Sequence, residues 1–141
     1  MMSIEIDHIG IAVSSLDERT PFWTALGLLR GEDESLPEDG VIARFLSTSG
    51  NSSEPARIEL LEATGKDTPI GRFIDRRGEG VQQIAFRVED IHSVIDRLLG
   101  HGVRMIDEKP RNGAHGSKIA FVHPSSTGGV LVELVQRSIA E

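Results

Sequence analysis

The feature of this sequence that most restricts its fold is a weak internal repeat. A shift of 75 residues aligns His8–Val13 with Gln83–Val88, and a shift of 74 aligns Ile58–Leu61 with Val132–Val135. Identity between the halves is low, but the aligned segments occur in the same order in both. Self-similarity at a fixed period is typical of a chain built from two copies of one supersecondary unit. We therefore expect two modules with the same topology.

Each half has the pattern of a strand, a helix and then further strands. Ile6–Val13 predicts the first strand, and Ser15 is expected to cap the next helix, with Glu18 completing a capping box. In the second half, Val81–Val88 predicts the strand, and a helix with its apolar stripe between Ile91 and Leu99 follows. Alternating apolar residues predict later strands at Val41–Leu46, Ala56–Leu61, Val103–Asp107, Lys118–Val122 and Val130–Val135.

The predicted architecture is an α+β fold in which two βαβββ modules place their sheets face to face around a cleft. Its length of 141 residues suits one domain, with modules at about 4–63 and 80–137 joined by a linking segment, 64–79. Ile70, Phe73 and Ile74 predict a short helix in this segment, while Phe22, Leu26 and Leu29 are expected to share the apolar face of the first helix.

Charge and composition exclude several classes of function. Fifteen basic residues against 22 acidic ones give a net charge of -7, which disfavours nucleic-acid binding. The chain has no cysteine, so disulfides, thiolate chemistry and zinc sites built on sulfur are excluded. No apolar run reaches the roughly 20 residues that cross a bilayer, and Met1–Asp7 does not resemble a signal peptide. We expect a cytoplasmic protein that does not bind membranes.

Four polar residues lie in strand segments with apolar neighbours: His8, Glu59, Gln83 and Glu133. A carboxylate in such a strand must be solvated, paired or bound to a cation, because burying it alone is too costly. The simpler interpretation is that each side chain faces water. The repeat, however, relates His8 to Gln83 and Glu59 to Glu133, which favours a shared site.

Together, the four would offer one imidazole nitrogen, one amide oxygen and two carboxylates. This set is dominated by hard oxygen donors and suits an octahedral divalent ion such as cobalt, manganese or magnesium. The other histidines are weaker candidates. His92 and His101 are expected on the exposed face of a helix, whereas His115, in a Gly-rich loop, and His123, at a strand end, could contact a ligand.

The common catalytic and phosphate-binding motifs are absent from the sequence. No serine lies in a nucleophile-elbow motif, and no Gly-x-Gly-x-x-Gly follows a predicted strand. Gly113–Lys118 is rich in glycine but lacks the spacing of a P-loop. With Arg111 and Lys118 it could still contact a nucleotide-like phosphate, and an ordinary hairpin loop is the alternative.

Several segments, taken together, resemble the methylmalonyl-CoA epimerases of the vicinal-oxygen-chelate, or glyoxalase, superfamily. The resemblance covers nearly the whole chain, and the complete set of motifs in this order is far more specific than the first one alone. The segments are Asp7–Val13, Pro37–Val41, Ile58–Glu62, Arg77–Val81, Gly102–Pro110, Phe121–Pro124 and Ser126–Leu134.

The resemblance implies an isomerase that interconverts (2R)- and (2S)-methylmalonyl-CoA by metal-assisted proton abstraction at C2. It implies an acyl-CoA substrate, a homodimer, and a divalent metal, with cobalt first and manganese, magnesium, zinc or nickel as alternatives. Position by position, the implied metal ligands are His8, Glu59, Gln83 and Glu133. Glu133 is also the implied catalytic carboxylate, and Lys118, His123 and Arg111 are the expected substrate-binding residues.

Two departures from the family keep other functions open. Gln82 and Gln83 stand where the family has two histidines, and Ala43 stands where some members have a second base. An amide oxygen binds metals more weakly than imidazole does, so metal affinity is expected to be lower. The alternatives are a glyoxalase-like or dioxygenase-like member of the same superfamily, and a non-catalytic small-molecule-binding protein.

Overall fold

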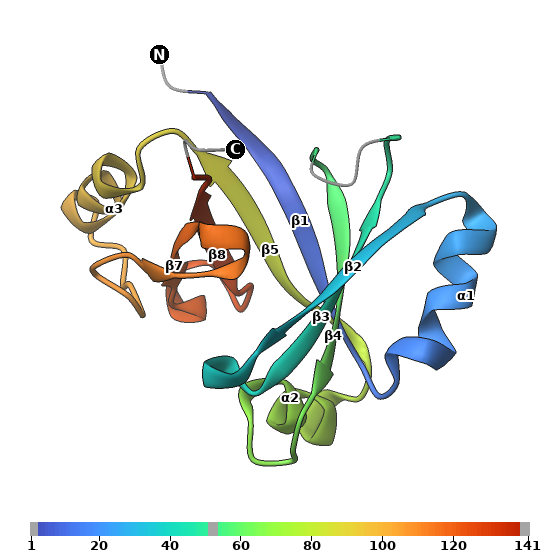
Figure 1. The fold of residues 1–141 in the computed structure, drawn as a ribbon. Coiled ribbons are helices and arrows are strands. Elements are labelled where there is room, and N and C mark those ends of the chain that lie inside the picture. The colour runs from blue at the N-terminus through green and yellow to red at the C-terminus, as the bar shows by residue number, and fades with distance from the viewer. Residues whose placement is uncertain (1–2, 51–53, 139–141) are drawn as a thin grey trace. The chain divides into compact units, whose positions relative to one another are not determined.

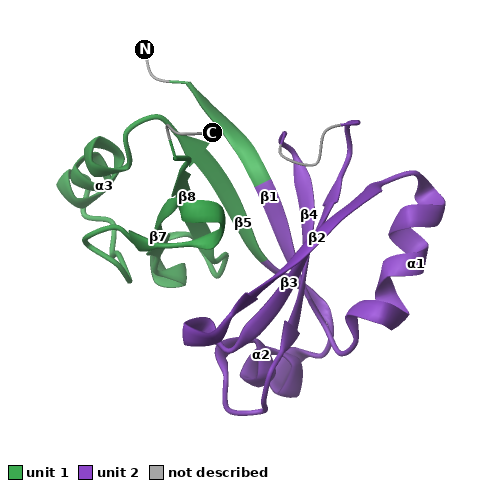
Figure 2. Ribbon diagram, viewed as in Figure 1, with its two compact units in different colours: residues 1–7, 83–141 green, residues 8–82 purple. Residues whose placement is uncertain are grey.

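The computed structural model describes residues 3–50 and 54–138 and divides the chain into two compact units (Figures 1 and 2). Unit 2 is His8–Gln82, and unit 1 combines Met1–Asp7 with Gln83–Glu141. The chain passes from one unit to the other inside a strand on both occasions. The first passage lies in β1 (Ile4–Val13) and the second in β5 (Gly80–Val88).

Unit 2 contains one strand, one helix and three further strands, followed by a second helix. Its sheet has the order β2-β3-β4-β1, in which β1 and β4 are parallel and the other neighbours are antiparallel. A short 3-10 turn, Pro37–Asp39, joins β2 to β3. After β1 the elements are α1 (Leu16–Leu26), β2 (Leu29–Leu36), β3 (Val41–Ser47), β4 (Arg57–Ala63) and α2 (Pro69–Arg77).

Unit 1 repeats the first strand, the first helix and the three further strands of this arrangement. Its sheet has the order β6-β7-β8-β5, in which β5 and β8 are parallel and the other neighbours are antiparallel. The predicted α+β fold of two βαβββ modules is therefore confirmed. After β5 the elements are α3 (Ile91–Gly100), β6 (Arg111–Asn112), β7 (Lys118–Val122) and β8 (Val132–Gln136), with 3-10 turns at Ala114–Gly116 and Pro124–Ser126.

The repeat extends to the register of the parallel strands. Gly10 pairs with Glu59 between β1 and β4, and Ala85 pairs with Glu133 between β5 and β8. These pairs are related by the shifts of 75 and 74 residues found in the sequence. His8 and Gln83 thus occupy equivalent positions on equivalent strands, two residues before Gly10 and Ala85.

Helix α1 begins directly after Ser15, as its cap predicts. The Ser15 hydroxyl accepts a hydrogen bond from the Glu18 backbone N–H at 3.2 Å. The Glu62 carboxylate on β4 accepts a second bond from the Leu16 N–H at 2.8 Å. Both bonds satisfy N–H groups that have no partner within a helix's first turn.

Helix α3 begins in the equivalent way. Asp90 Oδ1 accepts from the Ser93 N–H at 3.3 Å, and Gln136 Oε1 on β8 accepts from the Ile91 N–H at 2.8 Å. The hydrogen bond with Ser93 lowers the pKa of the Asp90 carboxyl. In each module, the residue before the helix and a side chain of the module's last strand therefore fix where the helix starts.

Ser15→Ala is expected to destabilise the protein by about 1 kcal/mol, because it removes the hydroxyl that caps α1. Urea denaturation followed by circular dichroism measures this change. Ser15→Asp keeps an acceptor at the same position and should retain most of the stability. Equal losses in the two variants would show that the cap does not stabilise α1.

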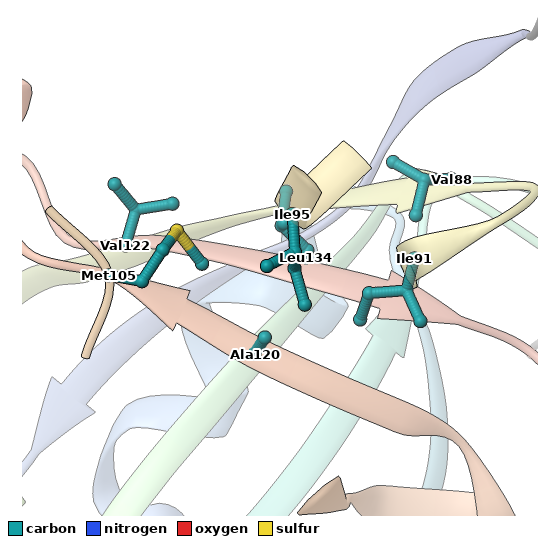
Figure 3. Packing of buried hydrophobic residues seen from close by; sticks show 7 residues of the cluster. All are labelled: Val88, Ile91, Ile95, Met105, Ala120, Val122 and Leu134. Carbon is teal, nitrogen blue, oxygen red and sulfur yellow. The ribbon is translucent and has the colours of Figure 1, made fainter. Parts of the chain in front are cut away.

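Each helix packs on one face of its own sheet. In unit 1, Ile91 and Ile95 of α3 pack against Leu134 of β8 in a buried cluster that Figure 3 shows. In unit 2, Leu16 of α1 is buried with Leu46 and Leu60 of the central strands. Side chains alternate between the two faces along a strand. His8 in unit 2 and Gln83 in unit 1 therefore lie on the sheet face opposite the helix.

The apolar face predicted for α1 is wrong. Phe22 and Leu26 are both 64 % exposed, and Leu29 belongs to β2 rather than to the helix. The buried side of α1 instead carries Leu16 and Thr20, and the Thr20 hydroxyl donates to the Leu16 carbonyl at 2.6 Å. A polar residue on the buried side hides the helical periodicity from a count of apolar positions.

The strand predicted at Val103–Asp107 is also wrong, since this segment makes only one isolated bridge, Met105 with Val122. The linking helix is confirmed as α2, which Thr68 caps by accepting from the Gly71 N–H. Within the described ranges 3–50 and 54–138, no helix has the length and apolarity needed to span a membrane.

Candidate functional site

His8 on β1 and Glu59 on β4 form a buried pair in unit 2. His8 Nε2 lies 3.2 Å from Glu59 Oε1, and both residues are only 5 % exposed. The interpretation that these strand residues face water is therefore wrong. A buried carboxylate needs a partner, and here the imidazole is one.

Two residues that the sequence analysis did not single out share this cluster. The Phe45 ring meets the His8 imidazole edge to face, with 6.0 Å between the ring centroids. The Arg57 guanidinium lies 4.4 Å from the Phe45 ring centroid and is only 4 % exposed. Register pairs His8 with Arg57 and Phe45 with Glu59, so all four side chains lie on one face of the sheet.

Gln83 on β5 and Glu133 on β8 form the equivalent pair in unit 1. Gln83 Nε2 donates to Glu133 Oε1 at 2.6 Å, and the two residues are 8 % and 5 % exposed. Glu133 lies between Ala85 of β5 and Phe121 of β7 in the sheet register. Because Ala85 and Phe121 are apolar, the Glu133 carboxylate lies on a largely apolar face of the sheet.

In the structure these four residues form two pairs, one in each unit. Within either unit, no group of three or more His, Asp or Glu side chains among the described residues is placed to hold a metal ion. A site with four ligands would have to draw on both pairs. That larger site stays a prediction.

The expected substrate-binding residues differ in where they lie. Arg111 on β6 shares the sheet face of Glu133, because it pairs with Ile119, which pairs in turn with Val135. Its guanidinium lies 5.4 Å from the Phe121 ring centroid, and its Nε is 3.4 Å from Asp107 Oδ1. Lys118 lies on the opposite face, where its Nζ donates to Asn112 Oδ1 at 2.9 Å.

The remaining histidines lie outside the two pairs. His123 follows β7, and its Nδ1 accepts from the Ser125 N–H at 3.0 Å. His115 lies in the Gly-rich loop with a positive φ of 58°. His92 is exposed on α3, and the His101 ring nitrogen Nδ1 is 2.8 Å from the Arg97 carbonyl at the end of that helix.

Asp7, which precedes His8 on β1, is fully buried in an ionic cluster of unit 1. Its Oδ1 accepts from Arg87 Nε at 3.0 Å and from Arg137 Nε at 3.3 Å. The partners are 80 and 130 residues away in the sequence. This cluster holds the start of β1 in unit 1 although the rest of the strand belongs to unit 2.

A second buried ionic cluster ties α1 to the sheet of unit 2. Arg44 is 4 % exposed, and its Nε and Nη2 donate to the two carboxylate oxygens of Asp33 at 2.7 and 2.8 Å. Its Nη1 donates to Thr20 Oγ1 and to Asp17 Oδ1, both on α1. The hydrogen bonds from Arg44 lower the pKa of the Asp33 carboxyl.

A cavity of about 430 Å³ in unit 2 is separate from the His8–Glu59 pair. It opens on the helix side of the sheet, the face opposite His8, because Ile11 and Val13 of β1 line it. At this cavity, Arg19 Nη2 lies 2.6 Å from Glu79 Oε2 in an ion pair. The hydrogen bond from Arg19 lowers the pKa of the Glu79 carboxyl. The other lining residues are Phe22, Trp23 and Gly80.

Comparison with known proteins identifies the family. The sequence model of the Glyoxalase/Bleomycin resistance protein/Dioxygenase superfamily matches residues 7–121. The chain is 35 % identical to the mitochondrial methylmalonyl-CoA epimerase of Bos taurus over 133 residues, which is 93 % of this chain and 73 % of the relative.

Two solved structures are similar over nearly the whole chain. The crystal structure of methylmalonyl-CoA epimerase from Mycobacterium tuberculosis is 36 % identical, with a TM-score of 0.88 and coverage of 96 % of this chain and 89 % of that one. A methylmalonyl-CoA epimerase in complex with methylmalonyl-CoA and NH4+ is 37 % identical, with a TM-score of 0.88 and 96 % coverage of both chains. The chain therefore belongs to the Glyoxalase/Bleomycin resistance protein/Dioxygenase superfamily, within the family of its methylmalonyl-CoA epimerase relatives.

Proposed function

We propose that this protein is a methylmalonyl-CoA epimerase that interconverts the (2R) and (2S) forms of its substrate. The observation that carries the proposal is the pair of buried carboxylates, Glu59 and Glu133, at equivalent positions of the two modules. Relatives that cover 93 % of this chain at about 35 % identity are named for the same reaction.

Inversion at C2 requires that a proton is removed from one face of the carbon and returned to the other. The substrate's thioester and carboxylate both acidify this proton, and the enolate that forms is the high-energy species. We assign Glu133 as a base, because it is a carboxylate on a largely apolar face. Its Oε1 is held by the Gln83 amide, which fixes the orientation of the carboxylate for proton transfer.

We further propose that His8, Glu59, Gln83 and Glu133 together hold a divalent ion, with cobalt as the first candidate. One imidazole, one amide and two buried carboxylates fit such an ion, because hard oxygen donors dominate the set. A bound divalent ion would polarise the carboxylate and thioester oxygens as a Lewis acid, which contributes several kcal/mol to such reactions. Manganese, magnesium, zinc and nickel remain the other candidates.

Replacing Gln83 by histidine is expected to raise the affinity for cobalt at least about tenfold, because an imidazole nitrogen binds this ion more tightly than an amide oxygen. Titration of metal-free protein with cobalt, followed by calorimetry, measures the change. Gln82→His, one residue away on the other face of β5, is the matched control and should leave the affinity unchanged. An unchanged affinity in Gln83→His would argue against Gln83 as a ligand.

The rest of the substrate is assigned to the basic residues near the Gly-rich loop. We propose that Arg111, Lys118 and His123 contact the phosphates of coenzyme A. Arg111 is the strongest of these candidates because it shares a sheet face with Glu133. We also propose that the protein is a homodimer, as the family resemblance implies, and that it is cytoplasmic.

The decisive experiment is exchange of the C2 proton of methylmalonyl-CoA for deuterium, followed by NMR, with cobalt added and with EDTA. Exchange well above the buffer rate is expected with cobalt. Exchange no faster than in buffer under both conditions would reject the epimerase assignment.

One observation favours a second candidate, a non-catalytic small-molecule-binding protein. The Gln83 amide gives Glu133 a hydrogen-bond donor, so this carboxylate has a partner without a cation. Tight binding of an unrelated small molecule, together with no C2 exchange, would support that candidate. A dioxygenase is less favoured, because the four residues include only one histidine.

A further inference from the structure

Inversion at C2 needs a second acid–base group besides Glu133, and the proposed function leaves that group unassigned. We propose that Glu34 on β2 is this group, acting on the substrate from the sheet face of unit 2 that carries the His8–Glu59 pair. The inference rests on the proposed function, because it takes that face as part of the substrate site.

The two groups must be different side chains, because a carboxylate that removes a proton from one face of C2 cannot return it to the other. One group therefore starts as a carboxylate and the other as a carboxylic acid. In one direction Glu133 takes the proton, and the electron pair of the C2–H bond passes into the thioester to form the enolate. The acid on the opposite face then gives up its O–H proton to form the new C2–H bond. The reverse direction exchanges the two roles, so no co-reactant is needed.

The sheet register places Glu34 on the face of the His8–Glu59 pair. Glu34 is the register partner of Ala43 across β2 and β3, and Ala43 is the partner of Leu61 across β3 and β4. Leu61 follows Glu59 by two residues on β4, so these two side chains share a face of the sheet. Glu34 therefore lies on the same face, in the row of side chains next to that of Glu59 and about 7 Å from it along the strands.

The burial of Glu34 differs from that of other polar residues on its strand. Glu34 is half-buried, whereas Glu32 and Ser35 are exposed. Because β2 is an edge strand, a glutamate on it would normally extend into water, so partial burial indicates that Glu34 lies against the sheet. Ala43, its neighbour, has only a methyl group, and adjacent strands are about 4.8 Å apart. The Glu34 side chain can therefore extend over Ala43 toward β4.

Two other carboxylates near Glu34 have different roles. Of the described strand residues of unit 2 that have a register partner, only Glu34 and Glu59 place a carboxylate on this face. Glu59 lies 3.2 Å from His8 Nε2, and we assign both residues to the divalent ion, which would occupy their electron pairs. Asp33 faces the other side of the sheet, where it accepts two hydrogen bonds from Arg44. Glu34 is therefore the carboxylate of unit 2 best placed to act as the second base.

The experiment measures inversion and substrate binding in the same variants. A coupled enzyme that consumes only one epimer measures inversion with cobalt present, and calorimetry measures binding of methylmalonyl-CoA. Glu34→Gln should lower inversion at saturating substrate by about 10²- to 10⁴-fold, the contribution typical of a positioned acid–base group. Its affinity for methylmalonyl-CoA should change less than about threefold, because the amide keeps the size of the side chain. Glu32→Gln removes an exposed carboxylate from the same strand and is the matched control, with both values expected within about twofold of the wild type.

Inversion at the wild-type rate in Glu34→Gln would overturn the inference. A loss of affinity as large as the loss of inversion would also overturn it, because Glu34 would then support binding rather than proton transfer.

If Glu34→Gln does not fold, Glu34→Asp tests the same point. This variant keeps the carboxylate but withdraws it by one methylene group, so inversion should fall at least about tenfold, and an unchanged rate would contradict the role of Glu34. Wild-type protein that neither inverts nor exchanges the substrate would reject the epimerase assignment and this inference with it. An active wild type with an unaffected Glu34→Gln rejects only the role of Glu34.

Discussion

Glu133→Gln is expected to reduce C2 proton exchange in methylmalonyl-CoA by about 10²- to 10⁴-fold, the contribution typical of a positioned acid–base group. The substitution keeps the size of the side chain and an acceptor oxygen for the Gln83 amide, but removes the negative charge and the proton acceptor. The loss should therefore appear chiefly in turnover. NMR measurement of deuterium incorporation under saturating substrate checks this.

Glu62→Gln is the matched control for that experiment. Glu62 is a carboxylate of β4 on the helix side of its sheet, where it accepts from the Leu16 N–H. Its replacement should leave the exchange rate within about twofold of the wild type and cost less than about 1 kcal/mol of stability. Equal exchange rates in Glu133→Gln and the wild-type protein would exclude Glu133 as the base.

The largest loss of stability is expected for Arg44→Met, which should lower the free energy of unfolding by about 2–3 kcal/mol. The substitution removes the two hydrogen bonds that the Asp33 carboxylate accepts from Arg44. It also removes the hydrogen bond that Arg44 donates to the Thr20 hydroxyl. This loss is smaller than the roughly 3–5 kcal/mol typical of breaking a fully buried ion pair, because the Asp33 side chain is 34 % exposed and can be partly solvated. Urea denaturation at pH 7 measures it.

The same ion pair predicts a dependence of stability on pH. Hydrogen bonds from Arg44 lower the pKa of Asp33 in the folded protein below its unfolded value, which is about 4. The stabilisation is therefore complete above that unfolded value and is lost as the pH falls through the folded pKa. Arg44→Met should lose this acid-sensitive part. Asp17→Asn should change stability far less, because the Asp17 side chain is 89 % exposed.

The topology could be predicted from the sequence because two independent signals agreed. The repeat fixed the order of elements, and caps such as Ser15 located the starts of helices. The strand β2 escaped prediction because Glu32, Asp33 and Glu34 are residues that strands disfavour. β2 pairs only with β3, so it is an edge strand of the unit 2 sheet, where charged residues are common.

The site could be predicted only in part. Polar residues in apolar strands identified His8, Glu59, Gln83 and Glu133 as candidates, and each of the four is buried in the structure. Arg57 and Phe45 were missed because an arginine at the start of a strand and a phenylalanine within one are common. Their position beside His8 and Glu59 follows from the register between strands, which the sequence does not specify. The direction of the Gln83 amide also depends on its neighbour, Glu133.

The division of β1 between the two units has a consequence for how the chain folds during synthesis. All of unit 2 lies in the continuous segment His8–Gln82, so its contacts can form before the second module has been made. Asp7 must wait, because Arg87 and Arg137 are synthesised much later. Contacts with such a large sequence separation form slowly and require the ends of a long loop to meet. β1 should therefore pair with β4 first and form the Asp7 cluster of unit 1 in a later step. The contact between Asp7 and Arg137 should be among the last to form.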